Sequence, residues 1–349
     1  MVKIGIIGAG SISASHLAAY RENPDAEVVA ICDIVKERAE ERARQFNIKG
    51  VYSSADEMLS QEQLDAVSVC VWNSAHAECT IKALEAGCHV LCEKPMATSA
   101  ADAERMLSTA KRMNKLLMIG FVLRFSENSK IIEDLKQNGV FGDFYYAKAT
   151  YTRRNGNPGG WFGDKARSGG GPVIDLGVHY IDKVRYHFGN PKPVSVYAVT
   201  YQKLFDRKHI KTKKGYYSAS HSENDICDVE DMASALIRFE NGSSLQIEVS
   251  FSLNQKEDIG TATLYGDRGG VSLSPFEIYT ELDGYMVDIT PKAIPAEDFQ
   301  KNFNSEIKHF TDCITKDIPC RAPAEDGVEI MRILDAVYRS AETGHEVTL

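Results

Sequence analysis

The segment Lys3–Tyr20, KIGIIGAGSISASHLAAY, constrains the fold of this chain more than any other. Its first part, Lys3–Ile7, becomes apolar and β-branched, which indicates a short buried strand. Gly8, Gly10 and Ser13 then occupy the positions of a G-x-G-x-x-G/A turn, and a helical pattern follows directly. A strand, a glycine turn and a helix in this order predict a unit that binds a dinucleotide.

Each position of the turn has a physical role. The first glycine allows the tight bend, the second lets the backbone approach the pyrophosphate, and the small Ser13 permits close packing of helix on strand. Ser11 and Ile12 enter the helix, where unpaired N–H groups favour the phosphates. Asp33, 23 residues beyond Gly10, ends the next apolar run and is expected to bind the adenosine ribose. This carboxylate predicts NAD over NADP, because a 2′-phosphate would meet a like charge. A glycine turn without a ligand is the alternative.

Composition excludes several classes of partner. With 349 residues the chain is long enough for two domains, and its net charge of -9 disfavours nucleic acid and anionic membranes as partners. We see no basic-then-apolar leader and no apolar run long enough to cross a bilayer. None of the eight cysteines forms a C-x-x-C pair, which is typical of reduced thiols. We therefore expect a cytoplasmic protein.

The chain changes pattern near residue 122. Before it, strand-like runs alternate with helical ones, which predicts a parallel sheet with right-handed crossovers, so we expect a Rossmann domain at 1–122. After it, strand-like runs follow one another, and Asn241-Gly242 marks a hairpin. We expect 123–349 to be an α+β domain with an open, mostly antiparallel sheet for substrate binding and oligomerisation. Helical runs at 298–315 and 324–342 close the chain, and the last is expected to be able to pack back on the first domain.

A polar segment, residues 204–228, lies between two strand-like runs and is rich in Lys, His and Ser. It is longer than a plain connection in a compact domain. A flexible surface loop, a lid and an oligomer arm all fit this segment, and the sequence does not separate them.

The residues that follow the strands of an open α/β sheet are candidates for the site, because ligands bind beyond the carboxyl ends of the strands. Lys94 is chemically the most specific of them. An ammonium beside a cofactor ring and a substrate hydroxyl can donate hydrogen bonds to both and stabilise a developing alkoxide. The alternative is a solvated surface lysine. The rule selects Asn73, His76, Glu93, Lys94 and Arg124.

A second candidate group lies in Ser168–His179, SGGGPVIDLGVH. Glycines followed by Pro172 suit a loop that leads into a helix. Asp175 and His179 are then at i and i+4 on one face, where a carboxylate and an imidazole suit proton abstraction from a hydroxyl. Gly177 suggests a close approach of another group, since glycine destabilises a helix. A structural Asp–His pair is the alternative.

Metal and hydrolase chemistry find no support in these patterns. His179 has no Cys or His at ligand spacing, and Cys88 and Cys92 would straddle a buried strand, so we expect no metal site. No G-x-S-x-G occurs, which leaves a Ser-His-Asp hydrolase without support.

Three motifs together resemble the Gfo/Idh/MocA family of oxidoreductases, which includes glucose-fructose oxidoreductase and inositol dehydrogenases. They are the opening glycine turn, Glu93-Lys94-Pro95 and the Asp175-x-Gly177-x-His179 helix. The likeness extends to Val229-Glu230-Asp231 and the final helix, and so covers nearly the whole chain. It implies hydride transfer between NAD and a sugar, glycoside or inositol hydroxyl by a homo-oligomer, a dimer or tetramer.

The resemblance also implies roles for single residues. Lys94 would bridge substrate and nicotinamide, His179 would accept the proton, and Asp175 would bind and orient the substrate. Trp161 lies in a loop expected to reach the nicotinamide, and Arg153 precedes it and helps to choose the substrate. Asn73, His76, Glu93 and Arg124 match positions along the cofactor cleft. Two alternatives stay open: a glycosidase that uses tightly bound NAD for transient oxidation, and a non-catalytic NAD-binding regulator.

Overall fold

The computed structural model describes residues 1–204, 207, 210–211, 216–293 and 298–349. These residues form two compact units. The first comprises Met1–Phe125 and Asp298–Met331, and the second comprises Ser126–Glu297 and Arg332–Leu349. Within the described ranges, no helix has both the length and the apolar character that crossing a membrane requires.

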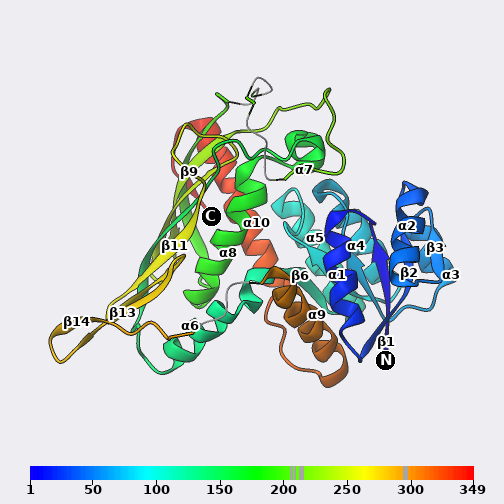
Figure 1. Cartoon of the computed structure of the whole chain (residues 1–349), viewed down its shortest axis with the longest axis horizontal. Coiled ribbons are helices and arrows are strands. Elements are labelled where there is room, and N and C mark those ends of the chain that lie inside the picture. Colours follow the sequence, from blue (N-terminus) through cyan, green and yellow to red (C-terminus); the bar gives the residue numbers. More distant parts are fainter. Residues whose placement is uncertain (205–206, 208–209, 212–215, 294–297) are drawn as a thin grey trace. The chain divides into compact units, whose positions relative to one another are not determined.

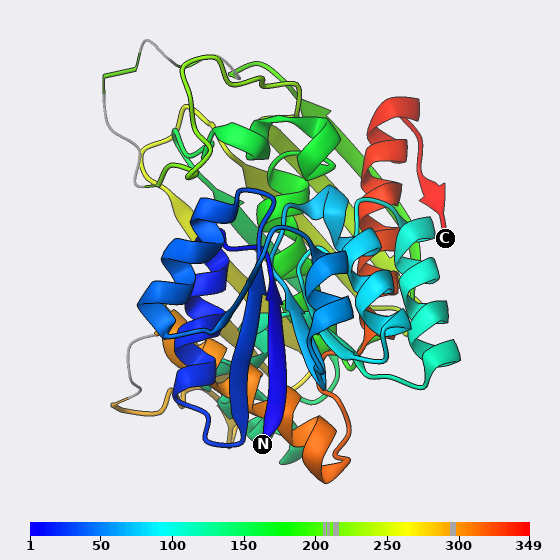
Figure 2. The same ribbon diagram turned by 90° about the vertical axis from the view of Figure 1, so that its right-hand side faces the viewer.

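The first unit contains a parallel sheet of six strands in the order β3-β2-β1-β4-β5-β6. Figure 2 shows helices on both sides of this sheet, as in a doubly wound fold. The strands are β1 (Val2–Ile7), β2 (Ala26–Cys32), β3 (Gly50–Tyr52), β4 (Ala66–Val69), β5 (His89–Glu93) and β6 (Leu117–Gly120). The helices are α1 (Ser11–Arg21), α2 (Lys36–Phe46), α3 (Ala55–Gln61), α4 (His76–Glu85), α5 (Ala100–Met113) and α9 (Phe299–Lys316), with short 3-10 turns η1 (Asn73–Ala75) and η2 (Val122–Phe125).

The strands of this unit are buried on both faces, which explains their continuous apolar sequences. Every residue of β4 is buried, and so are the four residues of β6. The edge strand β3 escaped the sequence analysis, because three half-buried residues carry too little pattern to predict a strand.

Helix α9 belongs to the first unit, although the sequence boundary near residue 122 placed it in the second domain. It packs on α1, where the rings of His16 and Phe303 lie 5.6 Å apart. The amide of Asn23 also donates a hydrogen bond to Thr311 Oγ1 at 3.0 Å. The correction has a physical reason: an amphipathic helix shows which face it buries, but its sequence does not show against which sheet.

The second unit contains a mixed sheet in the order β14-β13-β12-β11-β7-β10-β9-β8-β15. Among its described pairs only β10 with β7 is parallel, so the sheet is mostly antiparallel, as predicted. The strands are β7 (Phe144–Thr152), β8 (Pro193–Tyr201), β9 (Met232–Phe239), β10 (Ser244–Ser250), β11 (Ile259–Gly266), β12 (Gly269–Leu273), β13 (Phe276–Leu282), β14 (Tyr285–Asp288) and β15 (Val347–Thr348). The helices are α6 (Glu127–Gln137), α7 (Lys165–Ser168), α8 (Val178–His187) and α10 (Ala324–Thr343), with short turns η3 (Gly160–Gly163) and η4 (Val173–Gly177); the division between the units falls within α10.

This second sheet has two different faces. Helix α8 packs on one of them, against β7, β10 and β11 (Figure 1). Along β9 the residues Ala233, Ala235, Ile237 and Phe239 are buried, whereas Leu236 is 43% exposed. Further exposed apolar side chains on this sheet are Tyr145, Tyr197, Tyr265, Tyr279 and Tyr285. The sheet is therefore open on one face, as the strand pattern indicated.

Candidate functional site

The glycine turn after β1 has the form that a pyrophosphate requires. Gly8 adopts a φ of +99°, and a Cβ there would lie 2.5 Å from the carbonyl oxygen of Cys70, so only glycine fits. Gly10 is the residue before α1, so no side chain caps the N–H groups at the start of this helix. The space beside Gly10 is also open, because a Cβ there would meet nothing within 4 Å. The buried Ser13 donates its hydroxyl proton to Gly10 O at 2.7 Å. The N–H groups at the start of α1 therefore suit an anion.

Asp33 is tied to this turn from the end of β2. Its Oδ2 accepts the N–H of Ala9 at 2.8 Å, and its Oδ1 accepts the N–H of Val35 at 2.8 Å. Each oxygen keeps a further lone pair, so the carboxylate can still accept hydrogen bonds from ribose hydroxyls. Arg42 of α2 escaped the sequence analysis and donates to Gly10 O at 3.3 Å.

The half-buried Lys94 stands in a backbone segment that is held on both sides. Its own N–H donates to Glu93 Oε2 at 3.2 Å. On the other side, Nδ1 of His76 lies 2.7 Å from the carbonyl oxygen of Pro95. The second ring nitrogen of His76 lies 3.1 Å from Val71 O. Burial lowers the pKa of His76, although both carbonyl contacts oppose this effect.

Glu93 forms a buried pair with His16 of α1. Nε2 of His16 lies 2.8 Å from Glu93 Oε1, and both side chains are almost completely buried. Burial by itself would raise the pKa of Glu93, but the hydrogen bond and charge of His16 outweigh it, and the pKa lies below its usual value. Sequence reasoning missed His16, whose place on the buried face of α1, three residues after Ser13, was the signal.

Arg124 is 1% exposed in η2 and contacts residues of the segment that leads into α10. Its Nη1 donates to Asp326 Oδ2 at 2.8 Å and to the carbonyl oxygen of Arg321 at 2.7 Å. The guanidinium also lies over the ring of Phe121, 5.0 Å from its centre. These contacts fix the segment before α10 within the first unit. They orient Arg124, and its contact with the cofactor stays a prediction.

The segment that carries Asp175 and His179 differs from the predicted regular helix. Residues Val173–Gly177 form a π-helical turn, and α8 begins only at Val178. Asp175 therefore lies in the π turn and His179 in the first turn of α8, both half-buried. Such turns occur frequently at functional sites. A Cβ on Gly177 would lie 3.6 Å from its nearest neighbour, which is an ordinary contact distance. The surrounding chain therefore does not require glycine here, and the close approach predicted from the sequence has no counterpart within the chain.

Glu230, which lies just before β9, holds this π turn through hydrogen bonds. Its carboxylate accepts hydrogen bonds from the N–H groups of Gly171 and Val173, at 3.0 Å and 3.1 Å, and from the hydroxyl of Tyr338 at 2.9 Å. Burial raises the pKa of Glu230, and the two backbone N–H groups oppose the rise. A Cβ on Gly170 would collide with Tyr338, which explains that glycine. Sequence reasoning noted Glu230 only as part of a family motif and missed its contacts.

Residues 216–228 of the polar segment hold the loop that contains Trp161 through hydrogen bonds. The carboxylate of Asp225 accepts the N–H of Gly160 at 2.5 Å and lies 2.6 Å from His221 Nδ1. The N–H of Ser218 donates to Pro158 O at 2.9 Å. The described part of the segment thus packs on this loop, while residues 205–206, 208–209 and 212–215 lie outside the described chain. The ring of Trp161 stacks on Phe162, with their centres 4.0 Å apart.

Arg153 is held close to its own strand. Its guanidinium donates to Gly156 O and to the hydroxyl of Tyr151, both at 3.2 Å. The same group lies 5.3 Å from the centre of the Tyr151 ring. The side chain is half-buried and oriented before any ligand arrives.

Within the first unit, the candidate residues gather at the carboxyl ends of neighbouring strands. The glycine turn follows β1, Asp33 follows β2, Asn73 and His76 follow β4, and Glu93-Lys94 ends β5. The strand order reverses between β1 and β4, and ligands of such sheets bind at this switch point. The open helix start, the cradle at Gly8 and the acid on β2 fit a dinucleotide.

The fold and this turn define a two-domain oxidoreductase that binds NAD. The chain belongs to the Gfo/Idh/MocA oxidoreductase family. Residues 2–121 match its NAD-binding Rossmann fold, and residues 134–349 match its C-terminal alpha/beta domain.

One named relative and one solved structure match nearly the whole chain, and a second relative matches about half of it. D-glucoside 3-dehydrogenase of Escherichia coli (strain K12) is 36% identical over 351 residues, which span 100% of this chain and 97% of the relative. Myo-inositol 2-dehydrogenase of Thermotoga maritima is 31% identical over 54% of this chain and 55% of its own length. Levoglucosan dehydrogenase, in complex with NADH and levoglucosan, has the same fold with a TM-score of 0.86, at 22% identity and covering 99% of each chain.

Proposed function

We propose that this protein is an NAD-dependent dehydrogenase that oxidises a hydroxyl of a sugar, glycoside or inositol, with a D-glucoside as the first substrate to test. The observation that carries this proposal is the full-length identity of 36% with a D-glucoside 3-dehydrogenase. A glycosidase with tightly bound NAD and a non-catalytic regulator receive no comparable support, because the named relatives are dehydrogenases.

We propose three catalytic residues. NAD, when bound, accepts the hydride from the carbon that carries the reacting hydroxyl. His179 accepts the hydroxyl proton, since neutral imidazole is a suitable base near neutral pH. Lys94 donates hydrogen bonds to the hydroxyl and stabilises the developing alkoxide. Asp175 binds and orients the substrate, and Arg153 contributes to its choice. Hydrogen bonds hold the backbone on both sides of Lys94, and this supports a role in which the ammonium keeps a defined position.

The proposed cofactor residues divide by function. The phosphates bind at Gly8, Gly10, Ser11 and Ile12, and the adenosine ribose binds Asp33. The nicotinamide end involves Lys94, Asn73 and Trp161. Asn73, His76, Glu93 and Arg124 line the cofactor cleft in this proposal, and the contacts of His76 and Glu93 also position Lys94.

The proposal also covers the oligomeric state and the cellular location of the protein. The open face of the second sheet, which exposes Leu236, Tyr197 and Tyr265, supports a homo-oligomer, a dimer or tetramer, formed through this face. Light scattering at micromolar concentration checks it, and a monomer would overturn this part. We also propose a reducing, cytoplasmic location, since all eight cysteines are free thiols.

The test is a substrate screen with NAD. Sugars, inositols and D-glucosides are incubated with the purified chain, and NADH formation is followed by absorbance. The proposal expects one NADH per substrate molecule converted. A glycosidase would instead cleave the glycoside without accumulating NADH, and a regulator would bind NAD without turnover of any substrate in the screen.

A further inference from the structure

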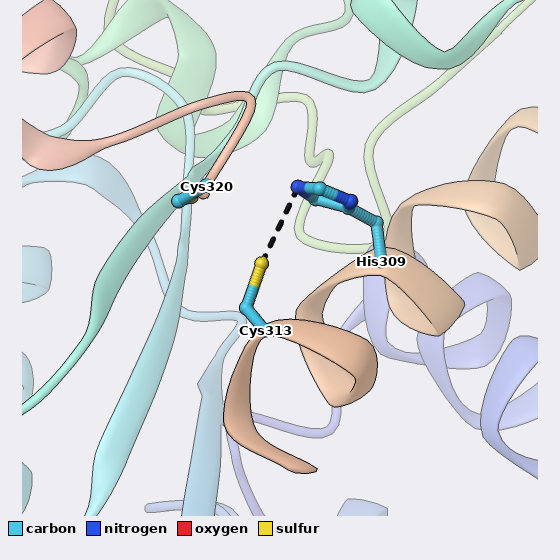
Figure 3. A group of neighbouring side chains, drawn as sticks. All are labelled: His309, Cys313 and Cys320. Carbon is cyan, nitrogen blue, oxygen red and sulfur yellow. Dashed lines mark hydrogen bonds between the residues drawn. The ribbon is translucent and has the colours of Figure 1, made fainter. Parts of the chain in front are cut away.

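A cluster of metal-ligating side chains lies in the first unit and shares no residue with the set proposed for catalysis. His309 and Cys313 are one turn apart on α9, and Cys320 lies in the loop that follows this helix (Figure 3). Their ligand atoms all lie within 4.8 Å of one another, and Cys313 Sγ is 3.4 Å from His309 Nε2. The expectation of no metal site considered only His179 and the pair Cys88 and Cys92. It overlooked the i, i+4 spacing of His309 and Cys313.

The distances fit a single metal ion. Around a tetrahedral zinc ion, sulfur and nitrogen ligands at about 2.3 Å and 2.0 Å lie roughly 3.5 to 3.8 Å from one another. The cluster reaches this size with small side-chain movements. One imidazole and two thiols are ligands that select zinc and similar transition metals over magnesium or calcium.

The imidazole presents the correct nitrogen to the cluster. His309 Nε2 accepts a hydrogen bond from the backbone N–H of Arg321 at 2.9 Å, which requires an unprotonated Nε2. The single lone pair of Nε2 accepts this N–H, with Cys313 Sγ also close by at 3.4 Å, and a metal ion would replace the hydrogen bond with a coordinate bond. The ring is oriented by Phe125, whose centre lies 5.4 Å away.

The loop that supplies Cys320 is held in place before any ion binds. The carbonyl oxygen of Arg321 accepts a hydrogen bond from the buried Arg124, and the guanidinium of Arg321 lies 5.1 Å from the centre of the Phe125 ring. Cys313 is buried, and His309 and Cys320 are half-buried, so a bound ion would be only partly open to water. Preorganised ligands with a remaining open position are typical of sites with three protein ligands.

We propose that His309, Cys313 and Cys320 bind one zinc ion, or another thiophilic divalent ion, with water in the fourth position. The ion links the end of α9 to the loop before α10 and stabilises the first unit. The two thiols lose their protons on binding, so the complex forms less readily at low pH. The site is independent of hydride transfer, because it shares no residue with the proposed catalytic set.

The first experiment titrates the reduced, metal-free full chain with Co²⁺ and then with Zn²⁺. We expect one Co²⁺ per chain with an intense thiolate-to-cobalt absorption, and its displacement by one Zn²⁺. The variants Cys313→Ser, Cys320→Ser and His309→Gln should each weaken binding at least tenfold, and either serine variant should diminish the thiolate band. The matched control Cys79→Ser changes a half-buried cysteine of α4 and should bind as the wild type does.

A second measurement needs only the wild type, so a variant that fails to fold does not obscure the result. Zn²⁺ should slow alkylation of Cys313 and Cys320 at least tenfold, measured on peptides by mass spectrometry, and leave Cys79 unchanged. Zn²⁺ should also raise the midpoint of thermal unfolding. Absence of stoichiometric binding, binding unaffected by all three variants, or a Cys313–Cys320 disulfide in the freshly isolated protein would overturn the proposal.

Discussion

Each unit holds its proposed catalytic segment with a glutamate, the buried Glu93 in the first and the half-buried Glu230 in the second, but the two differ in their electrostatic settings. Glu93 of the first unit pairs with a histidine, and its pKa is lowered. Glu230 of the second unit accepts hydrogen bonds from two backbone N–H groups and a tyrosine hydroxyl, and burial raises its pKa. The same side chain thus stabilises one backbone segment through a contact with a buried histidine and another as an acceptor of backbone and hydroxyl hydrogen bonds.

This difference has an energetic consequence. A hydrogen bond to a charged group contributes more to stability than one between neutral groups, and the lowered pKa of Glu93 favours its charged form. The segment around Lys94 should therefore be more sensitive to a change of charge, and the segment around Asp175 to a change of shape.

The catalytic residues themselves should give the largest effects. His179→Ala should lower kcat by roughly a hundred- to ten-thousand-fold, the usual contribution of a general base. In the wild type, kcat/KM for oxidation should rise with pH as the imidazole loses its proton. Lys94→Ala should lower kcat and also weaken substrate binding, because the ammonium contacts the hydroxyl in the ground state as well.

Steady-state kinetics together with NAD titration measure these effects. NAD affinity should survive His179→Ala, since that side chain faces the substrate in the proposal. Near wild-type kcat in this variant would remove proton transfer from the helix, and an equal loss of NAD affinity would show a structural effect instead.

The two glutamates should respond differently to the same isosteric change. Glu93→Gln removes the carboxylate that contacts His16 and should lower the free energy of unfolding by about 3 kcal/mol, the upper range for hydrogen bonds to charged groups. Glu230→Gln keeps one acceptor oxygen and should lower it by only about 1 to 3 kcal/mol. Denaturant unfolding followed by circular dichroism measures both values. Equal losses would contradict the electrostatic contrast between the units.

The second unit should also lose stability in mild acid. Burial lowers the pKa of His187 from 6.5 to about 4, and its Nδ1 contacts Glu133 Oε1 at 2.7 Å. As the pH falls through this range the unfolded chain binds a proton that the folded chain does not. The free energy of unfolding should therefore decrease between pH 6.5 and about 4, by about 3 kcal/mol, and this histidine adds nothing further below it.

A comparison of variants isolates this contribution from the carboxylates that titrate nearby. His187→Gln keeps a donor for Glu133 without a titrating ring, so its pH dependence should be flatter than that of the wild type. His345→Gln, which changes an exposed histidine, serves as the control. Identical pH profiles for His187→Gln and the wild type would refute the assignment.

Cofactor preference should show the smallest effect. Asp33→Ala removes the charge that opposes a 2′-phosphate, so the ratio of kcat/KM for NAD over NADP should fall by about tenfold, or about 1.4 kcal/mol. Arg42, beside Gly10, offers a matched change, and Arg42→Ala should weaken both cofactors alike. Equal use of both cofactors by the wild type would contradict the role of Asp33.

The sequence predicted those parts of the molecule in which one local pattern determines one structure. The turn at Gly8 needs a conformation that glycine alone adopts freely, and the buried strands leave continuous apolar runs. It missed β12, β13 and β14, whose half-exposed residues carry no continuous apolar run. It also missed His16 and Tyr338, because their partners are 77 and 108 residues away in the chain. The π turn at Asp175 has no recognised sequence signal of its own.

The assignment of α9 to the first unit has a consequence for dissecting this protein. A fragment that ends near residue 125 would contain every strand of the parallel sheet and yet leave the α1 surface around His16 uncovered. In topological terms, the second unit is largely an insertion between two pieces of the first. An isolated nucleotide-binding fragment should therefore be built as a fusion of residues 1–125 and 298–331 through a short linker, rather than by truncation.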